Sequence, residues 1–165
     1  PVSAVVMEYP QDEAARNLDD EYFFGKDLLV CPLTLEDGTS REVYLPEGNW
    51  YNFFTGEKIE GGRRLVLEAD WNEMLVFARD GALVPVAEPV ICVTEDTVFN
   101  ITVKSFGTNK TGSCVLYEDD FVSFNYESLV AKKQINVTVG DNGKFIVSGA
   151  KTSTKYHFLN CIVKD

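Results

Sequence analysis

The sequence predicts an all-β fold made of two small antiparallel β-sandwich modules. Short apolar or alternating segments recur roughly every ten residues, and glycine, proline, asparagine or aspartate closes most of them. Only residues 12–18 have the composition of a helix, and Asp12 is a suitable N-cap for one or two turns there. Many short strands with frequent turns and almost no helix are typical of sandwiches and barrels.

The first half of the chain opens with a four-residue apolar run at 4–7, which is typical of a strand buried on both faces. After the helical segment, strand-like runs alternate with turns. One of these turns is Asp37-Gly38, a pair that favours the positive φ of a tight hairpin. The strands predicted in this half lie at residues 27–31, 41–45, 50–54, 64–68, 74–78 and 82–85.

The strand rhythm pauses at residues 86–89, and we predict a boundary between modules there. Beyond it, the segment Gly-Asp-Asn-Gly at 140–143 is a hairpin turn between two alternating runs. The strands predicted in this half lie at residues 97–103, 113–117, 134–139, 144–147 and 155–159. The predicted organisation is a connecting segment at 1–23, a first sandwich at 24–86 and a second sandwich at 87–165.

The chain has 165 residues and a formal net charge of −11. Because an acidic surface repels phosphate groups, we predict neither a nucleic-acid partner nor a membrane partner, whereas neutral ligands such as sugars remain open. No run approaches the roughly 20 apolar residues of a membrane helix. The N-terminus has neither an initiator Met nor the features of a signal peptide, so we expect a piece of a longer protein whose compartment the sequence leaves open.

The cysteines and the single histidine predict no metal centre. The four cysteines are Cys31, Cys92, Cys114 and Cys161, and none of them forms a CxxC pair. A structural zinc site needs close ligand pairs, which these spacings and one histidine do not supply. We therefore predict buried thiols on strands and a packed or edge-strand position for His157, with no catalytic triad.

An aromatic segment is the first candidate for ligand binding. It contains Trp50, Tyr51, Phe53 and Phe54, all within one predicted strand. Exposed aromatic rings stack on the apolar faces of sugars, so the segment is a possible carbohydrate platform. Alternatively, alternate rings fill the core and the others cover a neighbouring domain, which is the interpretation we favour.

An acidic stretch, Glu118-Asp119-Asp120, is the second candidate. Residues two apart on a strand share a face, so Glu118 and Asp120 can point the same way and hold a calcium ion together with turn carbonyls. The alternative is a solvated turn at the end of a strand, and this is the interpretation we favour. No sequence pattern marks a nucleophile, a zinc hydrolase or a phosphate loop, so we predict no catalytic residue and no cofactor in this chain.

Several motifs, in order along the chain, resemble glycoside hydrolase family 31, which includes α-glucosidases and α-xylosidases. The most specific of them is REVYLPEGNWYNFFTGE, which is similar to the family's YLP-x-G-x-W-Y-D-F-x-T-G-E stretch. The segments that carry the resemblance are residues 5–12, 18–32, 41–57, 76–85 and 116–120. The resemblance implies that residues 1–23 hold the end of a catalytic barrel and its connection to the proximal and distal C-terminal sandwiches.

The resemblance also implies what the chain does. Enzymes of this family are retaining hydrolases whose aspartate nucleophile and acid/base sit on a preceding (β/α)8 barrel. Because such a barrel needs about 250 residues, a chain of this length cannot contain it, and no residue here matches the nucleophile motif. The expected function is therefore a non-catalytic C-terminal region that buttresses the barrel of the same parent chain. The alternative is a carbohydrate-binding module, with or without calcium.

Overall fold

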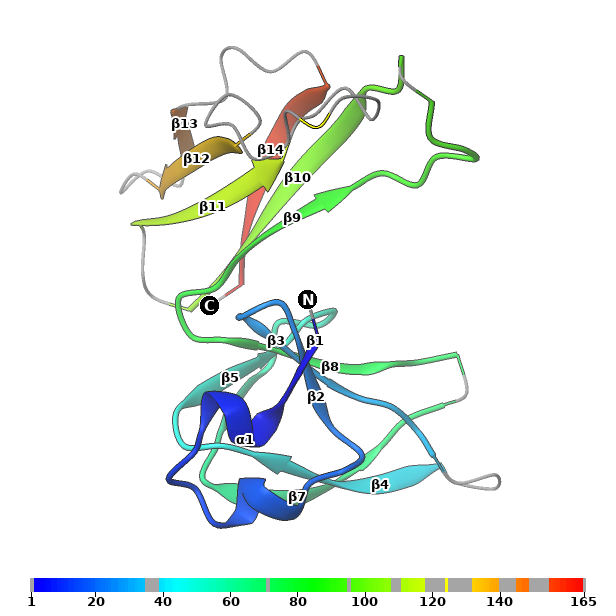
Figure 1. Cartoon of the computed structure of the whole chain (residues 1–165), viewed down its shortest axis with the longest axis vertical. Coiled ribbons are helices and arrows are strands. Elements are labelled where there is room, and N and C mark those ends of the chain that lie inside the picture. The colour runs from blue at the N-terminus through cyan, green and yellow to red at the C-terminus, as the bar shows by residue number, and fades with distance from the viewer. Residues whose placement is uncertain are drawn as a thin grey trace. The chain divides into compact units, whose positions relative to one another are not determined.

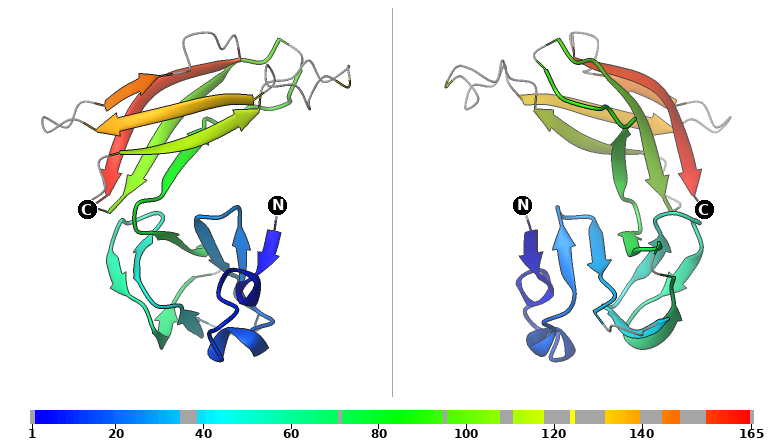
Figure 2. Two further views of the ribbon diagram at one scale, coloured as in Figure 1. Left: turned by 60° about the vertical axis from the view of Figure 1, so that its left-hand side comes forward. Right: turned by 90° about the vertical axis from the view of Figure 1, so that its right-hand side faces the viewer.

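The computed structural model confirms the predicted all-β class, since strands dominate the described residues and form several antiparallel sheets (Figures 1 and 2). The structure describes residues 2–34, 39–70, 72–94, 96–107, 111–117, 124, 132–139, 145–148 and 155–164. The chain divides into two compact units, residues 1–80 with 164–165 and residues 81–163. The division into a connecting segment and two sandwiches, with boundaries after residues 23 and 86, stays a prediction.

The first unit holds a six-stranded sheet and a separate two-stranded pair, both antiparallel. In sheet order, the six strands are β1 (Val2–Ala4), β2 (Tyr22–Phe24), β3 (Leu28–Cys31), β8 (Leu75–Arg79), β5 (Asn49–Asn52) and β6 (Lys58–Glu60). The separate pair joins β4 (Ser40–Leu45) to β7 (Arg63–Glu68). Strands β3, β4, β5, β7 and β8 match the predicted segments closely, whereas β2 and β6 were not predicted.

The N-terminal apolar run does not form the predicted strand at residues 4–7. The strand β1 ends at Ala4, and α1 (Val5–Glu8) follows as a single helical turn, closed by a 3.0 Å hydrogen bond from Tyr9 N to Val5 O. Val5 is fully buried, while Met7 is exposed. A short apolar run fits a strand and a buried helical turn equally well, and here packing of Val5 into the core selects the helical turn.

The predicted helical segment at residues 12–18 forms a short 3-10 turn, η1 (Ala14–Asn17), whose N-cap residue is Glu13 and not the predicted Asp12. Asp12 precedes it, and its Oδ1 accepts a hydrogen bond from Ala14 N at 3.0 Å. The other carboxylate oxygen of Asp12 accepts a 2.5 Å hydrogen bond from the hydroxyl of Tyr44 on β4. Burial, together with this contact, raises the pKa of Tyr44 to about 12. Asp12 therefore ties the N-terminal segment to the two-stranded pair.

A row of buried side chains crosses the inner face of the large sheet. Phe23, Leu29 and Phe77 lie directly opposite one another on β2, β3 and β8, and all three are fully buried. Complete burial of one such side chain contributes about 1.5–3 kcal/mol. The buried residues of this core are Val5, Ala15, Phe23, Leu29, Cys31, Val43, Leu45, Trp50, Ala69, Leu75 and Phe77.

Three aromatic rings run through this core. The ring of Phe23 lies 6.2 Å from that of Tyr9 and 6.1 Å from that of Trp50, measured between centroids. The indole Nε1 of Trp50 donates a 2.8 Å hydrogen bond to the carbonyl of Pro46, so its buried polar group is satisfied. The guanidinium of Arg79 lies 4.5 Å above the Phe23 ring and 5.1 Å above the Tyr9 ring.

An ionic cluster around the buried Arg41 links the segment before β2 to β4. Arg41 forms a 2.7 Å ion pair with Asp20 and also donates to the backbone carbonyls of Asp20 and Pro32. The buried Glu21 lies 3.5 Å from the same guanidinium and accepts a 2.7 Å hydrogen bond from Tyr44 N. Burial raises the pKa of Glu21 to about 7, although the Tyr44 hydrogen bond and the Arg41 charge oppose the shift.

The second unit contains two three-stranded antiparallel sheets. The first has the order β14 (Tyr156–Lys164), β10 (Phe99–Phe106) and β9 (Leu83–Ala87), and the second has the order β11 (Thr111–Tyr117), β12 (Lys132–Val139) and β13 (Phe145–Ser148). These strands match the predicted positions. The core of this unit contains Leu83, Ile101 and Val103, with the partly buried Phe99, Leu116, Tyr156, Phe158 and Cys161 packed against it.

Glu21 makes the stability of the first unit depend on pH. Its folded pKa of about 7 lies above its ordinary value of 4.5, so folding favours the protonated carboxyl group. The stabilisation that results from this raised pKa is fully present below about pH 4.5. It falls as the pH rises towards about 7, and it is absent above about pH 7. The difference amounts to about 3 kcal/mol. We expect Glu21→Gln to remove this fall, as measured by urea unfolding at about pH 5 and about pH 8.

The matched control for this experiment is Glu42→Gln. Glu42 lies on β4, is exposed, and pairs with Arg64 at 2.8 Å on the surface. In Glu42→Gln, the free energy of unfolding should fall between about pH 5 and about pH 8 by the same amount as in the unchanged protein. A fall of the same size in Glu21→Gln would contradict the role of Glu21.

Gly61 lies where a side chain would disrupt the Trp50 hydrogen bond. A Cβ atom at Gly61 would clash with the carbonyl oxygen of Pro46 and would lie 2.8 Å from Trp50 Nε1. We expect Gly61→Ala to lower the free energy of unfolding by about 3 kcal/mol, through overpacking and loss of this bond. Gly25→Ala meets no atom within 4 Å and should cost only about 1 kcal/mol, because of its left-handed backbone. Equal losses in urea unfolding would contradict the prediction.

Candidate functional site

The predicted aromatic platform divides between the two faces of β5. Trp50 and Tyr51 are neighbours on this strand, so their side chains point to opposite faces. Both are nonetheless buried, with exposed fractions of 1% and 2%. Trp50 belongs to the core described above. Neither ring therefore presents a face to solvent in this structure.

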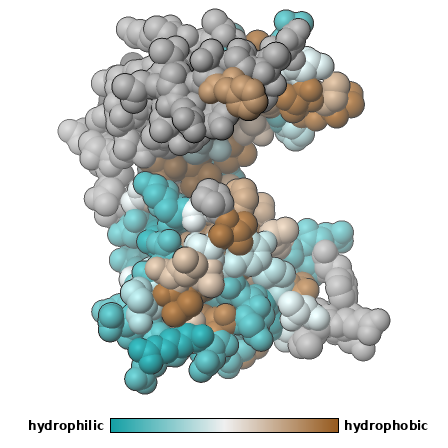
Figure 3. All heavy atoms as spheres, in the orientation of Figure 1, coloured by the Kyte–Doolittle hydropathy of each residue, from teal (hydrophilic) through white to brown (hydrophobic). Residues whose placement is uncertain are grey.

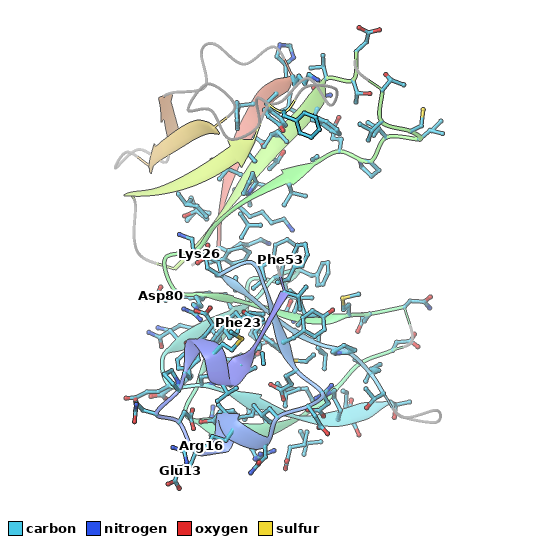
Figure 4. All side chains as sticks on the ribbon, in the orientation of Figure 1. Glu13, Arg16, Phe23, Lys26, Phe53 and Asp80 are labelled. Atoms are coloured by element: carbon cyan, nitrogen blue, oxygen red, sulfur yellow. The ribbon has the colours of Figure 1, made fainter. Side chains whose placement is uncertain are left out.

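Phe53 and Phe54 belong to a turn and not to the predicted strand, because β5 ends at Asn52. The Oδ1 atom of Asn52 accepts hydrogen bonds from the backbone N–H groups of Phe54 and Thr55, at 2.9 and 3.0 Å. The rings of Phe53 and Phe54 meet edge to face with centroids 5.2 Å apart, and Figure 4 shows Phe53. Gly56 completes the turn with φ of 84° and a 2.8 Å bond from its N–H to the carbonyl of Asn52.

A pocket of about 340 Å³ opens beside this turn, and we call it the turn pocket. It lies where β5 ends and β8 begins, since Asn52 is opposite Phe77 and the N–H of Phe53 bonds to the carbonyl of Val76 at 2.9 Å. The residues that line it are Asn52, Phe54, Thr55, Glu68, Asn72, Glu73, Met74 and Leu75. This pairing is what brings residues 52–55 next to residues 72–75.

A second pocket of about 310 Å³ shares two residues with the first, Glu68 and Glu73. Its lining residues are Thr39, Glu68, Ala69, Asp70 and Glu73. The two pockets thus adjoin at the same pair of exposed carboxylates. Sequence reasoning missed Asn72, Glu73 and Met74, because the connection between β7 and β8 carries no motif.

The acidic candidates Glu118, Asp119 and Asp120 lie outside the described residues, and so does the calcium site predicted at Glu118 and Asp120. Among the described residues, no group of three or more histidine, cysteine, aspartate or glutamate side chains is arranged to hold a metal ion. The carboxylates around the two pockets are therefore not gathered into a cation site.

A second row of residues crosses the outer face of the large sheet. Strand pairing places Val2, Phe24, Leu28, Ala78 and Tyr51 opposite one another on β1, β2, β3, β8 and β5, and we call this set the outer row. Ala78 and Tyr51 are buried, whereas Phe24 is 59% exposed and Val2 is 62% exposed. An apolar row that is open at one end is a candidate docking surface.

The open end of the outer row lies at the edge of the sheet. Strand β1 is the terminal strand and pairs only with β2 among the described residues. The exposed Met7 on α1 follows β1 directly in the chain. Figure 3 shows hydrophobic atoms reaching the surface around β1 and α1. An unpaired edge beside exposed apolar side chains is typical of a surface that another element covers.

Arg79 braces the inner side of this region. Its guanidinium lies over the rings of Tyr9 and Phe23, and it forms a 3.4 Å ion pair with Glu8 on α1. Burial raises the pKa of Tyr9, although the positive charge of Arg79 opposes the shift. Arg79 therefore connects α1 to β8 and holds the N-terminal segment in place beneath Phe24.

The cysteines follow the predicted burial only in part. Cys31 is buried in the core and burial raises the pKa of its thiol, and Cys161 is partly buried. Cys92 is exposed, which corrects the prediction, because its apolar neighbours lie in the connection between β9 and β10 and not on a strand. The side chain of Cys114 lies outside the described part. His157 is exposed on β14, the edge strand of its sheet, as predicted.

No helix among the described residues is long and apolar enough to cross a membrane.

A family model and two curated relatives all relate this chain to the same group of enzymes. The model of the family described as "Glycosyl hydrolase family 31 C-terminal domain" matches residues 1–84. The chain is 33% identical over 159 residues to the 1,6-alpha-glucosyltransferase of Sporosarcina globispora, covering 93% of this chain and 12% of that protein. It is 34% identical over 144 residues to alpha-glucosidase 2 of Bacillus thermoamyloliquefaciens, covering 86% of this chain and 18% of that protein.

Solved structures show the same relationship. The GH31 dextranase of Flavobacterium johnsoniae in complex with glucose superposes with a TM-score of 0.76 at 31% identity, covering 88% of this chain and 18% of that one. The GH31 alpha-xylosidase of Xanthomonas citri superposes with the same TM-score of 0.76 at 28% identity, covering 99% of this chain and 18% of that one. The chain thus spans less than a fifth of each of these relatives, and by its family match it belongs to the C-terminal domain family of glycoside hydrolase family 31.

Proposed function

We propose that this chain is the non-catalytic C-terminal region of a family 31 α-glycosidase and that it buttresses the catalytic barrel of the same parent protein. The parent would cleave O-glycosyl bonds of α-glucosides or α-xylosides in carbohydrate metabolism. The family match over residues 1–84 carries this proposal, because the matching relatives are several times longer than this chain.

The exposed end of the outer row supports the buttressing role. Val2 and Phe24 are directly opposite on β1 and β2, and each exposes more than half of its side chain. Covering such side chains is favourable, at about 25 cal/mol per Å² of apolar surface removed from water. Arg79 and Trp50 contact the ring of Phe23 on the inner face of the sheet and so hold β2 in position. The exposed end of the outer row is therefore a fixed apolar surface for a partner to contact.

The proposal can be tested in a chimera in which this chain replaces the corresponding region of alpha-glucosidase 2 from Bacillus thermoamyloliquefaciens. We expect a soluble chimera that hydrolyses an α-glucoside. Phe24→Asp should reduce its soluble yield and thermal stability by several degrees, because a carboxylate would be buried against the barrel. The same substitution should leave the melting temperature of the isolated chain nearly unchanged, since Phe24 is exposed there.

Val66→Asp is the matched control. Val66 is 72% exposed on β7 and lies outside the outer row, so its substitution should leave both the chimera and the isolated chain unaffected. Equal effects of Phe24→Asp and Val66→Asp on the chimera would contradict the docking surface. An insoluble chimera with every variant would contradict the wider proposal that the two parts are compatible.

A further inference from the structure

We propose that the turn pocket binds a neutral oligosaccharide. The proposal goes beyond the buttressing role, and it rests on the proposed function only for the choice of α-linked glucose units as the ligand.

The turn pocket is built on backbone that is fixed before any ligand arrives. On one side, the carboxamide of Asn52 holds the N–H groups of Phe54 and Thr55. Two backbone bonds of 2.8 Å close the same turn, from Asn52 N to the carbonyl of Glu57 and from Gly56 N to the carbonyl of Asn52. A side chain presented by a rigid turn loses little conformational freedom on binding, which favours recognition of weakly held ligands.

The opposite side is held in a similar way. The N–H of Glu73 donates a 2.8 Å bond to the carbonyl of Asp70, and β8 begins at Leu75, which is buried. Asn72, Glu73 and Met74 therefore stand on a short turn directly before a core strand. Both sides of the pocket are anchored to β5 and β8, which are paired to each other.

The residues that line the turn pocket offer both apolar surface and hydrogen-bonding groups, which complement the C–H faces and the hydroxyl groups of a sugar. Phe54 and Met74 are 55% and 56% exposed, so the pocket offers apolar surface to the C–H face of a pyranose ring. The carboxylates of Glu68 and Glu73 accept hydrogen bonds from hydroxyl groups, and the amide of Asn72 both donates and accepts them. Alternating apolar and hydroxyl-binding groups around one small pocket fit a polyol better than a purely apolar ligand.

Other classes of ligand fit less well. Two carboxylates and a chain charge of −11 disfavour an anion such as a phosphate or a nucleotide. A metal ion is disfavoured because these carboxylates belong to no cluster of three metal-binding side chains among the described residues. A neutral ligand with many hydroxyl groups is not repelled by the carboxylates and needs no cluster of metal-binding side chains.

The dimensions point to more than one sugar unit. The turn pocket measures about 340 Å³, near the lower end of ligand pockets, which begin at about 300 Å³. The adjoining pocket of about 310 Å³ shares Glu68 and Glu73, so the same two carboxylates can contact hydroxyls of successive sugars. This continuity favours an oligosaccharide over a monosaccharide.

The test is a titration of the purified chain with isomaltotriose, and separately with maltotriose and glucose, followed by amide chemical shifts in nuclear magnetic resonance. We expect shifts confined to residues 39, 52–55 and 68–75, and tighter binding of a trisaccharide than of glucose. Phe54→Ala should weaken binding by about tenfold, because it removes the stacking ring. Glu73→Gln should weaken it less, by roughly threefold, because the amide retains one acceptor oxygen.

Phe24→Ala is the control, since it removes an equally exposed ring from the outer row and should leave sugar binding unchanged. Shifts absent from the pocket at high sugar concentration, or equal affinity in Phe54→Ala and the unchanged protein, would overturn the proposal. A binding strength that falls steeply with salt would also overturn it, because it would indicate that charge, and not stacking and hydroxyl contacts, drives the binding. The chimera experiment is independent of these results, so the sugar site can fail while the buttressing role stands.

Discussion

Burial of the Trp50 indole is the constraint on which the first unit depends. An indole N–H removed from water needs an acceptor, and the Pro46 carbonyl supplies it at 2.8 Å, immediately before the turn into β5. The ring then packs beside Phe23, which packs in turn beside Tyr9. Three segments that are distant in sequence are thereby held together: the residues after α1, strand β2 and strand β5. Arg79 covers two of the three rings and completes the stack.

The exposed apolar edge follows from this inner packing. Because side chains alternate along a strand, an inward Phe23 requires an outward Phe24. Strand pairing then places Val2 directly beside Phe24, and both remain exposed. Keeping an exposed phenylalanine beside an exposed valine at a sheet edge invites aggregation unless another element covers them. The same alternation along β2 therefore produces both the buried core contact of Phe23 and the exposed surface at Phe24. A change in the register of β2 would alter both of them.

The sequence predicted most strands because turn residues separate them at regular intervals, and positions such as Arg41 to Leu45 have the period of a strand. It failed at residues 5–8, because the apolar run at 4–7 carries no periodicity that distinguishes a strand from a helical turn. It also failed to show that Trp50 lies on a strand whereas Phe54 lies in the following turn, since composition does not show that β5 ends at Asn52. The ionic pairing of Glu21 with Arg41 joins residues 20 positions apart, and local sequence patterns do not report such contacts.

Sequence reasoning named Phe54 as a candidate but did not predict the turn pocket that it lines, for a related reason. Its two sides come from residues 52–55 and 72–75, which meet only because β5 and β8 are neighbours in the sheet although β6 and β7 lie between them in the chain. Phe54 and Met74 contribute little to the core, because both expose more than half of their side chains. Substitutions there should therefore change recognition without changing folding, whereas the asparagine that fixes the turn serves both. The exposed recognition groups are therefore separate from the backbone that positions them, as the proposed sugar site requires.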